Sequence, residues 1–177
     1  MNDSDPASQQ RLGCGMIAAA WLLLLGLLYL LFADELDRQF NPNRSLSPYA
    51  TKDATELVLK QNRSGHYVSP GAINGRSVVF LLDTGATVVS VPAHQAAALG
   101  LAAGARQRVT TANGEVSVYA TRIEVLSLGP FRLHNVRAHL NPGLSGDAVL
   151  LGMSALRRLE LTQRGDTLTL RTIVERE

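Results

Sequence analysis

Residues 78–86 read Val-Val-Phe-Leu-Leu-Asp-Thr-Gly-Ala, an apolar run that ends on a carboxylate, a hydroxyl and a glycine. Five consecutive apolar residues, β-branched and aromatic at the start, are typical of a strand buried on both faces. A charge at the end of such a strand is costly unless it is hydrogen-bonded or used in chemistry. Asp83, Thr84 and Gly85 therefore form either an ordinary turn, in which Asp and Gly are favoured, or a functional loop.

Two more stretches follow this turn along the chain. Residues 110–116, Thr-Thr-Ala-Asn-Gly-Glu-Val, contain an Asn-Gly pair that favours a tight hairpin. Residues 149–159, Val-Leu-Leu-Gly-Met-Ser-Ala-Leu-Arg-Arg-Leu, place an apolar run and a glycine before a short helical segment. In this order, the three stretches resemble the active-site loop, the flap and the hydrophobic-hydrophobic-Gly element of retropepsin-like aspartic proteases. The resemblance covers about residues 64–172 and is nearest to bacterial, membrane-anchored, single-lobe members.

The resemblance implies an all-β fold, a small closed barrel with one or two short helices. It also implies aspartic endopeptidase activity on a peptide or protein substrate. Asp83 would be the catalytic residue, and its loop would be supported by Thr84, Gly85 and Ala86. The Thr84 hydroxyls of two chains would bond across a dimer axis and brace both loops.

Two further sets of residues acquire roles from the same resemblance. A flap covering the substrate is expected at Ala112, Asn113 and Gly114. Support of the active-site loop from the core is expected from Leu150, Leu151 and Gly152.

Peptide hydrolysis by carboxylates needs two of them, one to take a proton from water and one, protonated, to polarise the scissile carbonyl. The sequence contains Asp-Thr-Gly once. The other candidate acids are not followed by Thr-Gly after a buried strand; they are Glu115, Glu124, Asp147, Glu160 and Asp166. A symmetric homodimer would supply Asp83 twice. Two ionised carboxylates about 3 Å apart repel by about 5 kcal/mol at an effective dielectric near ~20, so the pair would share one proton.

Composition excludes several other functions. The chain has 177 residues and a net charge of +2 with no long basic run, which argues against nucleic acid as a partner. Cys14 is the single cysteine, so no internal disulfide or cysteine metal cluster can form. His134 and His139 are five residues apart and would face opposite ways on a regular strand. The sequence indicates no metal and no cofactor.

The N-terminal part predicts a membrane anchor. Residues 12–33 carry no charge over 22 positions, and such a helix spans about 33 Å, enough for a hydrocarbon core of about 30 Å. A cleaved signal peptide is the alternative, but the run is long for one and Leu31-Phe32-Ala33 is a poor cleavage site. The predicted organisation is a polar tail at 1–11, a transmembrane helix at 12–33, a tether at 34–63 and the protease domain at 64–177. Within the tether, residues 56–60 are a candidate short strand that joins the domain or its partner.

The charges beside this helix favour one orientation. Arg11 and the amino terminus flank one end of the helix. The other end is mainly acidic, and acidic residues count little in the positive-inside rule. The N-terminus is therefore expected inside and the domain outside, at the inner membrane with the domain in the periplasm. A different class of function remains open, namely a non-catalytic, membrane-tethered dimeric module that binds peptides or partners.

Within the domain, apolar alternation and turn residues predict consecutive short strands. Asn74-Gly75 predicts a two-residue hairpin. Pro92 and Gly100 predict the start and the end of a short helix over residues 92–99.

Overall fold

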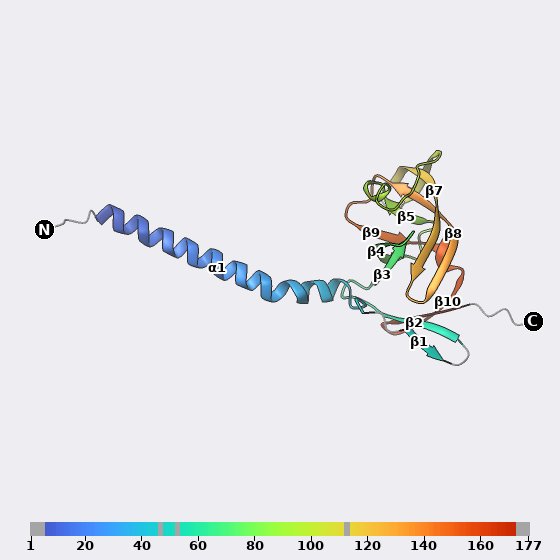
Figure 1. The fold of residues 1–177 in the computed structure, drawn as a ribbon, viewed down its shortest axis with the longest axis horizontal. Helices are drawn as coiled ribbons and strands as arrows, with labels where there is room; N and C mark the ends of the chain where they lie inside the picture. Colours follow the sequence, from blue (N-terminus) through green and yellow to red (C-terminus); the bar gives the residue numbers. More distant parts are fainter. Residues whose placement is uncertain (1–5, 46–47, 52–53, 112–113, 173–177) are drawn as a thin grey trace, which may run out of the picture. The chain divides into compact units, whose positions relative to one another are not determined.

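The computed structural model describes residues 6–45, 48–51, 54–111 and 114–172, and the chain divides into two compact units, Met1–Gln39 and Phe40–Glu177. The first unit is helix α1 (Pro6–Phe40, Figure 1). Its segment Gly15–Phe40 reaches a mean hydropathy of 2.5 with none of its apolar window buried. By length and composition the helix can cross a bilayer, although an N-terminal signal sequence has the same features.

Helix α1 is longer than the predicted span of residues 12–33. It begins at Pro6, a residue suited to a first helical position, so the polar tail is partly helical. It continues through Asp34-Glu35-Leu36-Asp37-Arg38-Gln39, in which most residues have good helix propensity.

The expected tether of residues 34–63 is largely structured. It holds the end of α1 and two strands, β1 (Pro48–Thr51) and β2 (Ala54–Lys60). Strand β2 pairs antiparallel with β11 (Thr167–Thr172), and Leu57 and Leu59 are fully buried. Burial of each leucine contributes about 1.5–3 kcal/mol, which explains why this segment joins the domain.

A buried asparagine holds the chain to the domain just after α1. Asn43 Nδ2 donates to the carbonyls of Lys60 and Val68 at 2.9 and 2.7 Å, and its Oδ1 accepts from the Lys60 N–H at 2.7 Å. These bonds join three separate segments within the second compact unit, Phe40–Glu177.

The larger sheet has the order β3-β4-β9-β5-β8-β7-β6 (Figure 1). Its strands are β3 (Tyr67–Ile73), β4 (Arg76–Leu82), β5 (Val89–Pro92), β6 (Arg106–Thr111), β7 (Gly114–Leu128), β8 (Phe131–Asn141) and β9 (Ala148–Leu151). Strand β3 also pairs with β7, so the sheet closes on itself while β6 extends beyond the closure. Together with the short helices η1 (Ala93–Gln95) and α2 (Met153–Leu156), this confirms the predicted all-β fold.

The smaller sheet packs its apolar face on the barrel. Its order is β1-β2-β11-β10, with β10 at Leu159–Arg164. Leu57 lies opposite Leu170 and Leu59 opposite Leu168, and all four belong to the same buried cluster as Phe80 of β4. The two sheets therefore share one core.

The Asn74-Gly75 hairpin is confirmed. Both residues have positive φ, 49° and 79°, as a two-residue hairpin turn requires. The Asn74 side chain also accepts from the Val125 N–H at 3.1 Å and donates to the Leu99 carbonyl at 3.0 Å, which ties the turn to two other segments.

The helix predicted over residues 92–99 is much shorter. Pro92 ends strand β5, and only Ala93–Gln95 form a 3-10 turn. The chain then turns through Gly100, at φ 67°, so that Leu99 and Leu101 are both buried. A segment of this length is too short to gain from helix propagation, and burial of the leucines decides its path.

Candidate active site

Strand β4 delivers Asp83 to the surface at the end of a buried run. Leu82 is buried, Asp83 is half-buried, and Thr84 and Gly85 are exposed. Asp83 Oδ1 accepts from the Gly85 N–H at 2.9 Å, and the Asp83 N–H donates to the Leu151 carbonyl at 3.1 Å. The backbone therefore orients the carboxyl group while its loop remains open to solvent.

Strand β9 lies between the strand that enters this loop and the strand that leaves it. β4 runs parallel to β9, with Leu82 opposite Leu151, and β5 pairs antiparallel with it at Ser90 and Leu150. Leu151 is fully buried, whereas Leu150 is half-buried on the opposite face. Leu151 and Gly152 thus lie in the core, whereas Leu150 is only partly buried.

Gly152 lies directly under the loop. A Cβ atom there would lie 2.6 Å from the carbonyl oxygens of both Ala86 and Val88. The next two residues bind the same loop, because the Met153 N–H donates to the Ala86 carbonyl at 2.7 Å and the Ser154 N–H to the Thr87 carbonyl at 3.0 Å. The start of α2 thus holds the loop through its backbone.

Ser154 is a loop-supporting residue that the sequence did not single out. Its buried hydroxyl accepts from the Val89 N–H at 3.0 Å and donates to the Arg137 carbonyl at 2.8 Å. One hydroxyl therefore links α2 to β5 and β8. The two contacts are 65 and 17 residues away in the sequence, so no local pattern reveals them.

We expect Ser154→Ala to lower the free energy of unfolding by about 2 kcal/mol, because it removes the hydroxyl that binds a buried N–H and a part-buried carbonyl. Thermal or urea unfolding measures the loss. The control is Ser77→Ala, at an exposed position of β4. Equal stability of the two variants would contradict a bridging role for Ser154.

The predicted flap lies only partly within the described residues. Ala112 and Asn113 fall outside them, whereas Gly114 begins β7 with φ 101° and is paired with Thr111 of β6. The Thr111 hydroxyl donates to the Gly114 carbonyl at 2.8 Å. The hairpin is therefore confirmed by its flanking pair, and its role over a substrate stays a prediction.

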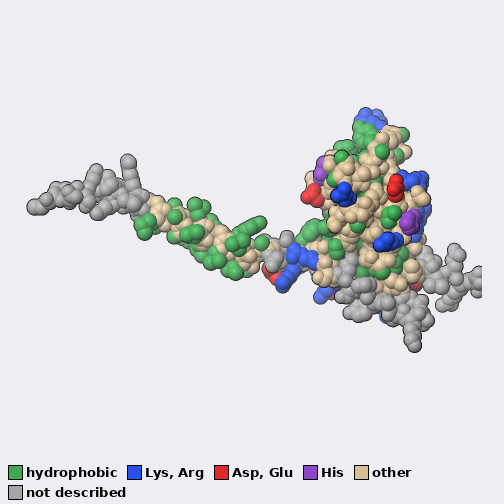
Figure 2. All heavy atoms as spheres, in the orientation of Figure 1, with side chains coloured by type: hydrophobic (Ala, Val, Ile, Leu, Met, Phe, Trp, Pro, Cys, Tyr) green, Lys and Arg blue, Asp and Glu red, His purple; other side chains and the backbone are tan. Residues whose placement is uncertain are grey.

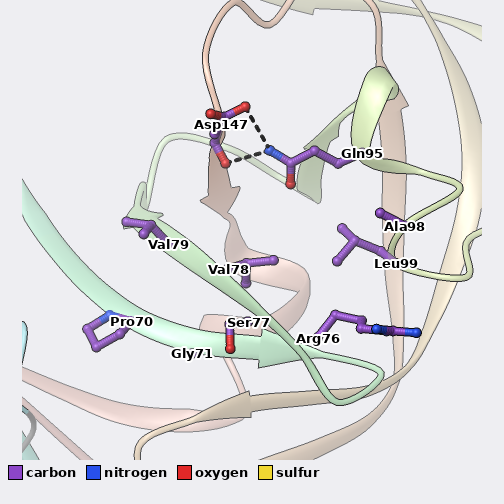
Figure 3. Close-up of a pocket in the computed structure, with 10 residues that line it drawn as sticks. All are labelled: Pro70, Gly71, Arg76, Ser77, Val78, Val79, Gln95, Ala98, Leu99 and Asp147. Atoms are coloured by element: carbon purple, nitrogen blue, oxygen red, sulfur yellow. Dashed lines mark hydrogen bonds between the residues drawn. The ribbon is translucent and has the colours of Figure 1, made fainter.

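A groove of about 690 Å³ lies beside the upstream half of β4 (Figure 3). Its lining includes Arg76, Val78 and Val79 of β4, Leu99, and Asp147 before β9, but not Asp83. This groove is therefore distinct from the half-buried Asp83 and its exposed loop.

The rim of this groove holds a polar pair that the sequence did not predict. His94 Nε2 lies 3.0 Å from Asp147 Oδ1, and Gln95 Nε2 donates to the Asp147 carbonyl at 2.8 Å (Figure 3 shows the Gln95 contacts). Chiefly through the hydrogen bond with His94, the pKa of Asp147 is lowered from its ordinary value. Both side chains are largely exposed, so the contact joins two loops with little effect on stability.

The sequence that builds this site is similar to a known family and to two bacterial proteins. Residues 69–158, about half of the chain, match the family described as "gag-polyprotein putative aspartyl protease". An uncharacterized protein in the cobV 5′ region of Sinorhizobium sp. is 31% identical over 134 residues, or 73% of this chain and 58% of that protein. An uncharacterized protein of Rickettsia prowazekii (strain Madrid E) is 27% identical over 108 residues, or 59% of this chain and 46% of that protein. The matches thus span only about half the length of these relatives.

A solved structure of another protein has a similar fold, and the match covers nearly the whole length of that other protein. The crystal structure of a retropepsin-like aspartic protease from Rickettsia conorii matches with a TM-score of 0.58 and 26% identity, covering 72% of this chain and 96% of that one. The family match includes the Asp83 loop, the β6–β7 hairpin and the Leu151-Gly152 support beneath the loop. The chain therefore belongs to the retropepsin-like aspartic protease family.

Proposed function

We propose that this protein is an aspartic endopeptidase whose active site forms when two copies bring their Asp83 carboxyl groups together. The observation that carries the proposal is the Asp83 loop itself. Its carboxylate is oriented by the Gly85 N–H, its backbone is held by Leu151 and by the start of α2, and its tip is exposed.

Among the described residues, the acids discussed above give no second carboxylate in this setting. Asp147 contacts His94, and Glu56 is paired with Arg171 at 2.8 Å. The remaining candidates lie on other elements: Glu115 and Glu124 on β7, Glu160 on β10, and Asp166 in the β10–β11 turn. A two-fold axis beside the exposed Thr84 and Gly85 would supply the missing carboxyl group from a second copy.

The chemistry then follows from one shared proton. The ionised Asp83 takes a proton from a water molecule, whose oxygen attacks the scissile carbonyl carbon. The protonated Asp83 of the other copy donates to the carbonyl oxygen and stabilises the tetrahedral intermediate. Proton transfer to the amide nitrogen lets the C–N bond break, which releases an amine and a carboxylic acid. Under this proposal, Ala112, Asn113 and Gly114 cover the bound peptide.

A shared site predicts concentration-dependent activity. For the fragment of residues 40–177, which corresponds to the second compact unit, we expect specific activity to fall on dilution below the dimer dissociation constant, because a monomer holds half a site. Peptide cleavage at acidic pH, measured alongside sedimentation over the same concentrations, tests this. Full-length protein in vesicles should resist dilution better, since anchoring raises the local concentration.

The outcomes separate the alternatives. Thr84→Ala should shift the dilution curve to higher protein concentration, since each lost hydrogen bond costs about 1 kcal/mol. Constant specific activity in a sample shown to be monomeric would exclude the shared site. A folded dimer that cleaves no member of a mixed peptide library between about pH 3 and pH 7 would favour the non-catalytic binding module.

We also propose that α1 anchors the protease at the inner membrane with its domain in the periplasm. The support is the uncharged apolar stretch of α1 and the preference for basic residues on the inner side. The full-length protein should remain with membranes after washing in alkaline carbonate, and a periplasm-dependent reporter fused after Glu177 should be active. A soluble product starting near residue 34 would identify a cleaved signal, and a silent reporter would place the domain in the cytoplasm.

A further inference from the structure

Three exposed arginines lie on β7, on β8 and just after α2. Arg122 on β7 and Arg137 on β8 are directly opposite in the antiparallel register. Arg158, in the turn after α2, donates from Nη1 to the His134 carbonyl and from Nη2 to the Asn135 carbonyl at 3.3 Å. Arg122 Nη1 donates to the same Asn135 oxygen at 3.3 Å. The guanidinium groups of Arg122 and Arg158 therefore share one acceptor, and the backbone of Arg137 lies opposite that of Arg122 on the neighbouring strand.

This arrangement places like charges on neighbouring strands without a direct ion pair in the described residues. Like charges directly opposite in a sheet destabilise it. Within the described residues, none of the three arginines forms an ion pair. The nearest acids in the sequence are Glu124, two residues after Arg122, and Glu160, two residues after Arg158, and neither is bound to them. Burial and the charge of Arg137 lower the pKa of His139, two residues further along β8. Figure 2 shows Lys/Arg and His side chains over the region of β7 and β8, with an Asp or Glu side chain among them.

The guanidinium groups retain donors for a ligand. Each carries five N–H groups in a planar fork, a geometry that matches phosphate oxygens. Arg122 uses one nitrogen and Arg158 two in bonds to backbone carbonyls, which fix their positions. Arg137 makes no side-chain hydrogen bond in the described ranges, so its donors remain available. A bound anion would relieve the repulsion among the three.

We propose that Arg122, Arg137 and Arg158 form a binding site for a phosphate group, carried by an anionic phospholipid or free in solution. A phosphate satisfies several forks at once and carries the opposite charge. The lipid source rests on the proposal above that α1 anchors the chain, because anchoring exposes the domain to anionic headgroups that carry phosphate. The site is independent of Asp83, so Asp83→Asn should bind the same ligand with unchanged affinity.

The test uses the full-length chain in a neutral detergent. Calorimetric titrations employ inorganic phosphate, dihexanoyl phosphatidylglycerol and, as a zwitterionic comparison, dihexanoyl phosphatidylcholine. We expect Arg137→Gln to weaken binding at least about fivefold, Arg137→Lys to lose less, and Glu124→Gln to strengthen it. The matched control is Arg164→Gln, which removes the same charge from the exposed end of β10 and should stay within about twofold of the wild type.

The results distinguish a lipid headgroup from free phosphate, and they also test whether the site exists. Tighter binding of phosphatidylglycerol than of phosphate identifies a headgroup site, and equal binding identifies free phosphate as the ligand. Equal weakening by Arg137→Gln and Arg164→Gln would overturn the proposal, since only diffuse charge would be involved. Tighter binding of poly-glutamate than of either phosphate ligand would also overturn it, because the partner would then be an acidic peptide.

A second measurement uses the wild-type chain and does not depend on the folding of any variant. Phenylglyoxal modifies exposed arginines, and mass spectrometry reports the extent at each position. Phosphatidylglycerol vesicles or inorganic phosphate should protect Arg122, Arg137 and Arg158, but not Arg164. Equal modification of the three arginines with and without both ligands would refute the site.

Discussion

Asp83→Asn should reduce peptide cleavage by at least about a thousandfold, because the amide has the shape of the carboxyl group but cannot act as a general base. In the proposed dimer, this one substitution removes both catalytic carboxyl groups, because each copy contributes its own Asp83. The fold should survive. The amide oxygen can still accept from the Gly85 N–H, which lies 2.9 Å from Oδ1, and the Asp83 N–H still donates to Leu151. Initial rates on a cleaved peptide, with thermal unfolding of the same sample, test both parts.

Asp147→Asn is the matched control. It makes the same chemical change at an exposed acid outside the loop, so activity should stay within about threefold of the wild type. If Asp83→Asn retained activity within about tenfold of the wild type, the chemistry would have to lie elsewhere. A folded, inactive Asp83→Asn beside an active Asp147→Asn would assign the reaction to the loop.

Gly152→Ala should unfold the domain at a temperature about 10 °C lower and reduce activity by about a hundredfold or more. The backbone at Gly152 has φ −88° and ψ −177°, which alanine adopts without strain. The penalty comes from space, because the added methyl group would lie 2.6 Å from the carbonyl oxygens of Ala86 and Val88. Backbone atoms cannot rotate aside, so the loop must move, and we place the cost near the upper end of overpacking, about 3 kcal/mol.

The control for this prediction adds the same methyl group where it meets nothing. Gly26→Ala lies in α1 with no atom within 4 Å of the new Cβ and should leave the unfolding temperature of the domain unchanged. Calorimetry and cleavage rates of both variants provide the measurement. Wild-type stability and activity in Gly152→Ala would show that the loop tolerates displacement and that its contact with Gly152 is unimportant.

Local signals in the sequence determined the main features of this protein. The apolar run before Asp83 predicted a strand that ends in a loop, because hydrophobic burial and turn propensity act over a few neighbouring residues. Asn74-Gly75 and Asn113-Gly114 predicted two hairpins, since two-residue turns require positive φ. The uncharged stretch of residues 12–33 predicted a long apolar helix, although its ends lie in flanking residues of good helix propensity.

Tertiary structure alone decided which distant groups meet. Asn43 joins the chain after α1 to β2 and β3, Ser154 links α2 to β5 and β8, and His94 meets Asp147 across 53 residues. Residues 54–60 belong to the domain because β11, more than a hundred residues later, offers them a pairing edge and a core. These contacts form because the barrel closes and because buried polar groups must be hydrogen-bonded. Neither cause produces a periodic pattern in the sequence.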